Sequence, residues 1–409
     1  MKELKDFSLI IIAIIGIVSI FAGYYLLFFS TFTAIFLISL AQFWNKNIFN
    51  KLKIERNLSQ KRVNIGDKIY YEIEIENKKF LPVLGLILKD KVTVGIDFIN
   101  KSFSQKVPGN NFDLFQDLFS LKWYEKVNRK YDFIPKKRGY YRFGEGNLFY
   151  SGVFGFYKNK LFDNNYCELI VYPKILNAKK LNVNLKQLFG SSISEGWIHK
   201  DPLNKVGVRP YESTDDIKKI NWKASARHNK LESNVYKPSY DREINIFLST
   251  LTTENWWEGI NSNLLELLII YAASIANHAL NKGYQVGVYS DGLIKRSSSS
   301  LKLKPGKGSL HKKTLFSNLA ILQPADKMKF SNILYKERRN LKNSSTVILI
   351  LTILNDDIKK VINQYKKRYN LSLIIIGDRD YNLKGLKGVK IYRIKGKEDW
   401  DAIKELELA

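Results

Sequence analysis

The chain has 409 residues, of which 45% are hydrophobic, and it carries 66 Lys and Arg against 39 Asp and Glu, a formal net charge of +27. This length and apolar content support two or three folded domains and exclude a disordered chain, while the charge is compatible with nucleic acid, an anionic membrane or an acidic protein as partner. The single cysteine, Cys167, excludes an internal disulfide and a metal site built from several cysteines.

Residues 1–50 predict a transmembrane helical hairpin. No charged residue lies between Phe7 and Trp44, and this run is long enough for two short crossings, because one crossing needs about 20 apolar residues. Gly23 supplies the break, and residues 8–43 are expected to contact lipid. Basic residues precede and follow the run, so the positive-inside rule predicts a multi-pass protein of the cell membrane with the bulk of the chain cytoplasmic.

Residues 51–176 predict an antiparallel β-sandwich. Residues 70–76 alternate polar and apolar side chains with the period of a strand. Further strand-like runs occupy residues 83–88, 121–127, 131–134 and 169–172. Gly, Asn and Pro turn signals separate these runs, and we find no catalytic spacing among them.

Residues 177–240 begin as a polar connecting loop and continue into a stretch that is dense in Arg, Asp, Trp and Lys. Thr214 or Asp215 can cap a helix, which predicts one short amphipathic helix after it. Apolar residues follow at helical spacing: Ile217, Ile220 and Ala224. One acid and three cations fall four apart, as in a salt-bridged surface helix: Asp215, Lys219, Lys223 and Arg227.

This stretch resembles the signature of the domain of unknown function 58 family. The matching positions are Arg209, Tyr211, Asp215, Asp216, residues 220–227 and Leu231. The family usually has Gly, Arg and Asp at the positions that Thr214, Lys218 and Asn221 hold here. The resemblance implies a membrane-anchored protein with a von Willebrand factor A-like domain, and members of the family look like companions of MoxR-type AAA+ ATPases.

Residues 241–409 predict a doubly wound α/β domain, which the resemblance implies is von Willebrand factor A-like. Apolar strands are expected at 244–250, 285–290, 346–351, 371–377 and 389–394. Helices are expected at 263–281, 309–322, 328–341, 355–369 and 399–408. Strands that are apolar on both faces and alternate with helices indicate a parallel sheet covered on both sides.

Ligand sites of such domains lie at the carboxyl ends of the strands. Metal-binding von Willebrand factor A domains carry Asp-x-Ser-x-Ser after the first strand, and the corresponding positions here are Ser249, Leu251 and Thr253. Because no carboxylate remains among them, we expect the Mg²⁺ site to be lost and predict no cofactor. The nearby acids that could restore a site are Glu254, Asp291, Asp356 and Asp378. We find no other catalytic motif and do not predict an enzyme.

A basic stretch runs from Lys295 to Lys313, into the start of the helix expected at 309–322. Its cations are Lys295, Arg296, Lys302, Lys312 and Lys313, and residues 304–309 are expected to form a basic turn that caps the helix. This stretch is either a solvated face or a docking surface for an acidic protein or lipid headgroups. Nucleic acid is not expected as a partner, because no recognition module is visible.

Two functions from different classes remain open. The first is a membrane-anchored, non-enzymatic adaptor that binds a protein partner on the cytoplasmic side, and the resemblance implies a MoxR-type AAA+ ATPase. Its residues are Arg209, Tyr211, Asp215, Asp216, Trp222, Lys223 and Arg227, in a buried polar network, which we favour, or in a docking face. The alternative is a metal-dependent ligand-binding protein or hydrolase with Asp215, Asp216 and His228 as ligands.

Overall fold

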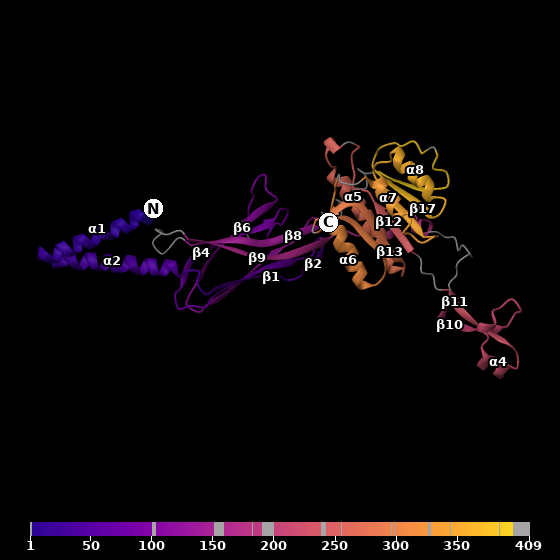
Figure 1. The fold of residues 1–409 in the computed structure, drawn as a ribbon, viewed down its shortest axis with the longest axis horizontal. Coiled ribbons are helices and arrows are strands. Elements are labelled where there is room, and N and C mark those ends of the chain that lie inside the picture. Colours follow the sequence, from indigo (N-terminus) through magenta and orange to yellow (C-terminus); the bar gives the residue numbers. More distant parts are fainter. Residues whose placement is uncertain are drawn as a thin grey trace. The chain divides into compact units, whose positions relative to one another are not determined.

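The computed structural model describes residues 2–99, 104–150, 159–181, 183–189, 200–238, 243–254, 256–295, 297, 299–325, 329–343, 345–383 and 385–395. The chain divides into two compact units, Met1–Tyr172 and Pro173–Ala409 (Figure 1). The helix expected at 399–408 lies outside the described residues.

The N-terminal unit begins with two apolar helices, α1 (Lys2–Phe21) and α2 (Tyr25–Lys46). Gly23 has a φ of 75° between them, so the chain breaks where the sequence predicts. A Cβ on Gly16 would lie 3.0 Å from Thr31 Oγ1, which places the two helices in close contact. Length and composition make α2 a candidate membrane span, and the rest of the chain does not cover its apolar stretch.

Two β-sheets follow the helices and share one core. The strands are β1 (Leu52–Leu58), β2 (Arg62–Asn64), β3 (Ile69–Asn77), β4 (Val83–Thr93), β5 (Ser104–Gln105), β6 (Phe112–Leu121), β7 (Lys126–Phe133), β8 (Gly139–Tyr150) and β9 (Asn159–Tyr172). One sheet has the order β1-β3-β7 and the other β2-β9-β8-β4-β6-β5, with antiparallel pairs except β2 with β9. Aromatic rings on the inner faces, among them Tyr71, Phe115 and Phe143, pack together in the core.

The strand predicted at 121–127 is wrong. β6 ends at Leu121, β7 begins at Lys126, and the residues between them form a turn in which Tyr124 has a φ of 51°. Asn77 holds this turn, because its Nδ2 donates to Lys122 O at 2.8 Å and its N–H to Glu125 O at 2.9 Å. The aromatic residues that suggested a strand are exposed at the turn.

A buried ion pair lies inside the sandwich. Arg56 donates from Nε and Nη2 to the two carboxylate oxygens of Asp90, at 2.9 and 2.8 Å, and also pairs with Asp163. The Tyr71 hydroxyl donates to Asp90 Oδ2 at 2.7 Å. A Cβ on Gly146 would lie 2.0 Å from Asp90 Oδ1, so only glycine leaves room for the carboxylate.

The second unit contains a mixed α/β sheet. Its strands are β12 (Glu243–Leu248), β13 (Gln285–Ile294), β14 (Ser300–Gly306), β15 (Leu322–Gln323), β16 (Thr346–Leu351), β17 (Asn370–Ile376) and β18 (Lys390–Ile394), and its helices are η3 (Trp256–Glu258), α5 (Ser262–Asn281), α6 (Ser309–Ala320), α7 (Phe330–Glu337) and α8 (Asp356–Tyr365). The order is β14-β13-β12-β16-β17-β18. β12, β13, β16, β17 and β18 are parallel, whereas β14 and β15 pair antiparallel with β13.

Helices cover both faces of this sheet, as predicted for a doubly wound domain. Phe247, Leu349 and Leu373 point to one face and pack with side chains of α7 and α8. α5 contacts β12, β13, β16 and β17, and alternation along the strands assigns it to the opposite face. The five strands that the sequence predicts are all parallel to one another. The basic turn expected at 304–309 is wrong, because residues 304–306 belong to the antiparallel strand β14.

The connecting loop expected after residue 176 is packed structure in its first part. η1 (Ala178–Leu181) and α3 (Leu185–Leu188) follow Tyr172, and Leu181, Leu188 and Phe189 are buried. The N–H of Leu176 donates to Ser274 Oγ of α5 at 2.8 Å. Scattered leucines in a polar stretch are enough to bind it to the α/β core, although they show no regular period.

Candidate functional site

The residues that resemble the family signature fold into a β-hairpin with a structured tip, here called the signature arm (residues 207–235). Its strands are β10 (Lys200–Pro210) and β11 (Glu232–Pro238), with Arg209 opposite Ser233. The tip contains η2 (Ile217–Lys219) and α4 (Trp222–His228) instead of the single predicted helix.

Two side-chain caps divide the tip. Asp216 Oδ1 accepts from the N–H of Lys218 at 3.1 Å and begins η2, while Asn221 Oδ1 accepts from the N–H of Ala224 at 3.2 Å and begins α4. Ile220 lies between them with an extended backbone, so the helix cannot continue through it. Asn and Asp are equally good caps, so the family's usual Asp would serve the same purpose at position 221.

Asp215 is the centre of a polar network within the arm. Its Oδ1 accepts from Arg209 Nη2 at 2.7 Å and its Oδ2 accepts from the N–H of Glu212 at 3.3 Å. The Tyr211 hydroxyl donates to the Asp215 carbonyl oxygen at 3.2 Å. The pairing predicted between Asp215 and Lys219 depended on a continuous helix, and Arg209 takes that place.

Further hydrogen bonds attach α4 to β11. Ser225 Oγ donates to Asn221 O and accepts from the N–H of Glu232, both at 2.9 Å. His228 Nδ1 lies 2.6 Å from Glu232 Oε1, and Asn229 ends the helix in the left-handed conformation. The position of Ser225 between two backbone groups is a role that sequence spacing did not indicate.

The outer surface of the arm is apolar and cationic. Ile217 is 69% exposed and Trp222 is 67% exposed, and Lys223 and Arg227 are also exposed. Arg209, Tyr211 and Asp215 are half-buried and contact one another. The favoured buried network therefore reduces to these three half-buried residues. It is wrong for the four exposed ones, Asp216, Trp222, Lys223 and Arg227.

The alternative ligand set is not assembled in one place. Asp215 is engaged by Arg209, Asp216 by the N–H of Lys218, and His228 by Glu232. Within the described ranges no group of three or more His, Cys, Asp or Glu side chains is arranged to hold a metal ion.

A second candidate region lies at the carboxyl ends of the parallel strands. In the sheet, β13 lies on one side of β12, and β16 and β17 lie on the other side. Such a switch in strand order is where open α/β sheets bind ligands.

Asp291 occupies the strand end beside β12. Its side chain is 1% exposed and accepts from Ser249 Oγ at 3.0 Å, from the N–H of Thr250 at 2.7 Å and from Thr250 Oγ1 at 2.8 Å. Burial raises the pKa of this carboxyl to about 6, although the hydrogen bonds from Thr250 and Ser249 favour the charged form. Asp291 was among the acids that the sequence placed near this site, but its contact with Thr250 was not foreseen.

These residues do not fit a Mg²⁺ site. The Ser249 hydroxyl donates a hydrogen bond to Asp291, and the Thr253 hydroxyl donates one to Gly259 O at 2.6 Å. Leu251 supplies only its carbonyl oxygen, which accepts from the Thr352 hydroxyl. Of the other acids, Glu254 pairs with Arg379 and Asp356 with Lys359. A hard cation would have to displace internal donors from a single buried carboxylate.

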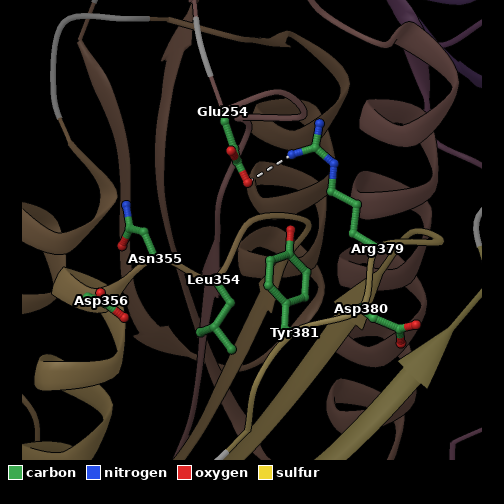
Figure 2. A pocket seen from close by; sticks show the side chains of 7 residues that line it. All are labelled: Glu254, Leu354, Asn355, Asp356, Arg379, Asp380 and Tyr381. Atoms are coloured by element: carbon green, nitrogen blue, oxygen red, sulfur yellow. Dashed lines mark ion pairs between the residues drawn. The ribbon is translucent and has the colours of Figure 1, made fainter.

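An open pocket of about 700 Å³ lies among the segments that follow β12, β16 and β17 (Figure 2). It is lined by Glu254, Leu354, Asn355, Asp356, Arg379, Asp380 and Tyr381. Arg379 Nη1 lies 3.1 Å from Glu254 Oε1, and the Tyr381 hydroxyl donates to Thr352 O at 2.7 Å. The ionisable lining residues are three acids, Arg379 and Tyr381, and the acid Glu254 is paired with Arg379.

The basic stretch is only partly a solvated face. Lys302 Nζ lies 2.6 Å from Glu337 Oε1, and Lys312 Nζ donates to Asn281 Oδ1 at 3.1 Å. Lys313 is exposed. Arg296 lies outside the described residues.

Two solved structures match a smaller part of the chain. The CARDB domain of a Pyrococcus furiosus protein is 16% identical, with a TM-score of 0.20, over 29% of this chain and 91% of that domain. A cohesin module from a Clostridium perfringens glycoside hydrolase is 14% identical, with a TM-score of 0.21, over 30% of this chain and 95% of that module.

Among curated proteins, the uncharacterized protein YeaD of Bacillus subtilis (strain 168) is 21% identical over 239 residues, which are 58% of this chain. The chain spans 55% of the length of that relative. Residues 207–392, which include the signature arm and the α/β sheet, match the family model described as Protein of unknown function DUF58.

Proposed function

We propose that this protein is a membrane-anchored, non-enzymatic adaptor whose signature arm docks a protein partner. The proposal rests on one observation: some signature residues stabilise the arm internally, whereas others are exposed. Arg209, Tyr211 and Asp215 hold the backbone from within, while Trp222 and Arg227 are exposed. Trp and Arg are the residue types most enriched among those that dominate protein interfaces.

The N-terminal helices supply the anchor in this proposal. α2 has a mean hydropathy of 2.0 over its apolar stretch and is long enough to cross a bilayer. The exposed cation Lys46 ends α2, and exposed Lys51 follows it. We therefore place residues 8–43 in the membrane as a hairpin and the bulk of the chain in the cytoplasm.

The partner that we propose is a MoxR-type AAA+ ATPase, on the strength of the resemblance of residues 207–231 to the family signature. The exposed cations of the arm favour an acidic surface on that partner. Ser249, Thr253 and Asp291 make hydrogen bonds within the protein. These bonds support our proposal that the domain is von Willebrand factor A-like and works without Mg²⁺ at its strand ends.

The test is crosslinking in native membranes followed by capture of the full chain. The Trp222→Ala, Arg227→Ala variant removes one exposed aromatic and one exposed cation from α4. The matched control, Leu310→Ala, Lys313→Ala, removes one exposed apolar side chain and one exposed cation from α6. Thermal melting must show equal folding of all three proteins.

We expect the arm variant to weaken capture of the ATPase about 30-fold, which corresponds to the 2 kcal/mol or more that defines a dominant interface residue. The control variant should capture the partner as well as the unaltered protein does. Undiminished capture by the arm variant would remove the arm as the docking face, and loss in both variants would indicate a non-specific charge effect.

A further inference from the structure

Aromatic side chains are exposed at the tips of two loops of the sandwich. Phe80 lies in the loop between β3 and β4, and Trp123 and Tyr124 lie in the turn between β6 and β7. They are 69%, 59% and 68% exposed. The rings of Phe80 and Trp123 stack at 5.7 Å between centroids and 7° between planes, yet each keeps most of its surface open to its surroundings.

The loop between β3 and β4 is hydrogen-bonded to the end of α2 and to the residues that follow this helix. Trp44 Nε1 donates to Pro82 O at 3.1 Å, and the N–H of Lys78 donates to Lys51 O at 3.0 Å. Lys79 Nζ donates to Asn50 O at 2.9 Å and to the Ile48 carbonyl oxygen. The N–H of Tyr124 donates to Lys79 O at 3.2 Å, which ties the second loop to the first.

The end of α2 is also packed into the sandwich. Ile48 is fully buried in the core, and Trp44 and Phe49 pack against it. The aromatic tips are therefore held close to the point where the apolar helix ends.

The two loops form a fixed frame for these rings. Asn77 is fully buried and donates through Nδ2 to Leu81 O at 2.9 Å and to Lys122 O at 2.8 Å, one acceptor in each loop. The N–H of Lys122 donates to Glu125 Oε2 at 2.6 Å. Because the backbone is bonded on both sides, the exposure of the aromatic rings is imposed by the fold.

We propose that Phe80, Trp123 and Tyr124 insert into the lipid headgroup region beside α2 and fix the sandwich on the bilayer surface. This inference rests on the membrane anchoring in the proposed function. Trp and Tyr favour this region because one end of the side chain is apolar and the other forms hydrogen bonds. Exposed Lys46, Lys51, Lys78 and Lys122 stand nearby for anionic headgroups.

The test uses nitroxide labels on the full chain in liposomes that contain phosphatidylglycerol. Cys167 lies in β9, where burial raises the pKa of the thiol to about 12, and is replaced in a Cys167→Ala background. Single cysteines are introduced by Phe80→Cys, Trp123→Cys and Tyr124→Cys. The control is Lys136→Cys, which follows β7 at the end opposite the aromatic tips and has an exposed side chain.

Collisions of the label with O₂, which enters lipid, and with a polar nickel chelate, which does not, are compared in proteins that float with the liposomes. We expect several-fold fewer nickel collisions and more O₂ collisions at positions 80, 123 and 124 than at 136. Values equal to those at 136 would overturn the inference while leaving the anchor intact.

A decrease in collisions with both reagents would show that protein, such as a second copy of this chain, covers the tips, and would also overturn it. Failure of every variant and of the unaltered chain to float would refute the anchoring itself. In that case the proposed function fails together with this inference.

Discussion

Asp291→Asn is the most informative substitution in the α/β unit. Asp291 is buried within β13, directly after the last residue that pairs with β12, and accepts hydrogen bonds from Ser249 and Thr250. Asn keeps the size and one carbonyl oxygen of the side chain but cannot ionise. The variant therefore approximates the protonated form of the native residue at every pH.

The magnitude follows from the pKa shift. Burial raises the pKa of Asp291 from 3.8 to about 6, so the folded state binds more protons than the unfolded state between these values. Native stability is therefore highest below pH 4 and decreases as the pH rises through 6. With about 1.4 kcal/mol per pKa unit, the decrease is about 3 kcal/mol. The free energy of unfolding of Asp291→Asn, relative to that of the native protein, should therefore rise by this amount between pH 4 and pH 8.

Hydrogen exchange of the full chain measures this difference locally, through the opening free energy of peptides that cover β12 and β13. Comparing variant and native protein at each pH cancels the titration of other groups. Asp291→Ala is the second variant, and it should lower protection at every pH, because each donor left without an acceptor costs about 1–3 kcal/mol. Identical pH dependence in native and Asn proteins would refute the burial argument.

Substitutions at two other positions test one contact in each unit. Arg56→Met should destabilise the sandwich by about 3–5 kcal/mol in urea unfolding, because Asp90 keeps a buried charge without its partner; a loss below 1 kcal/mol would contradict a buried pair. In the signature arm, Asn221→Asp should leave α4 unchanged and Asn221→Ala should cost about 1 kcal/mol, measured by hydrogen exchange of residues 222–228. Equal losses in both would contradict the cap.

The central strands of the α/β unit were predictable because each is a short run of mostly apolar residues in the sequence. The strand predicted at 346–351 coincides with β16, since five consecutive apolar residues after Thr346 indicate burial on both faces. β14 was missed because an edge strand needs apolar residues on one face only. In β14, Leu301 and Leu303 alternate with lysines, and the lysines together with Pro305 suggested a basic turn.

The residues of the signature arm were predictable from the sequence, but their partners were not. Spacing assigned Asp215 to Lys219 because the argument assumed one helix across the tip. The caps at Asp216 and Asn221 interrupt that helix, and the turn between β10 and η2 brings Arg209 to Asp215 instead. A pairing between residues in different elements depends on backbone geometry, which periodicity does not contain.

The distribution of hydrogen bonds favours binding over acid chemistry in the regions that we consider functional. Asp215 and Asp291 each accept hydrogen bonds from protein donors on both carboxylate oxygens, so both side chains are already engaged within the fold. A metal or substrate would have to break these bonds, at about 1–3 kcal/mol for each one lost. Trp222 and Arg227 are exposed, and a partner could cover them without breaking the internal network of the arm. The energetically cheaper use of this arrangement is therefore contact with another protein at the surface of α4.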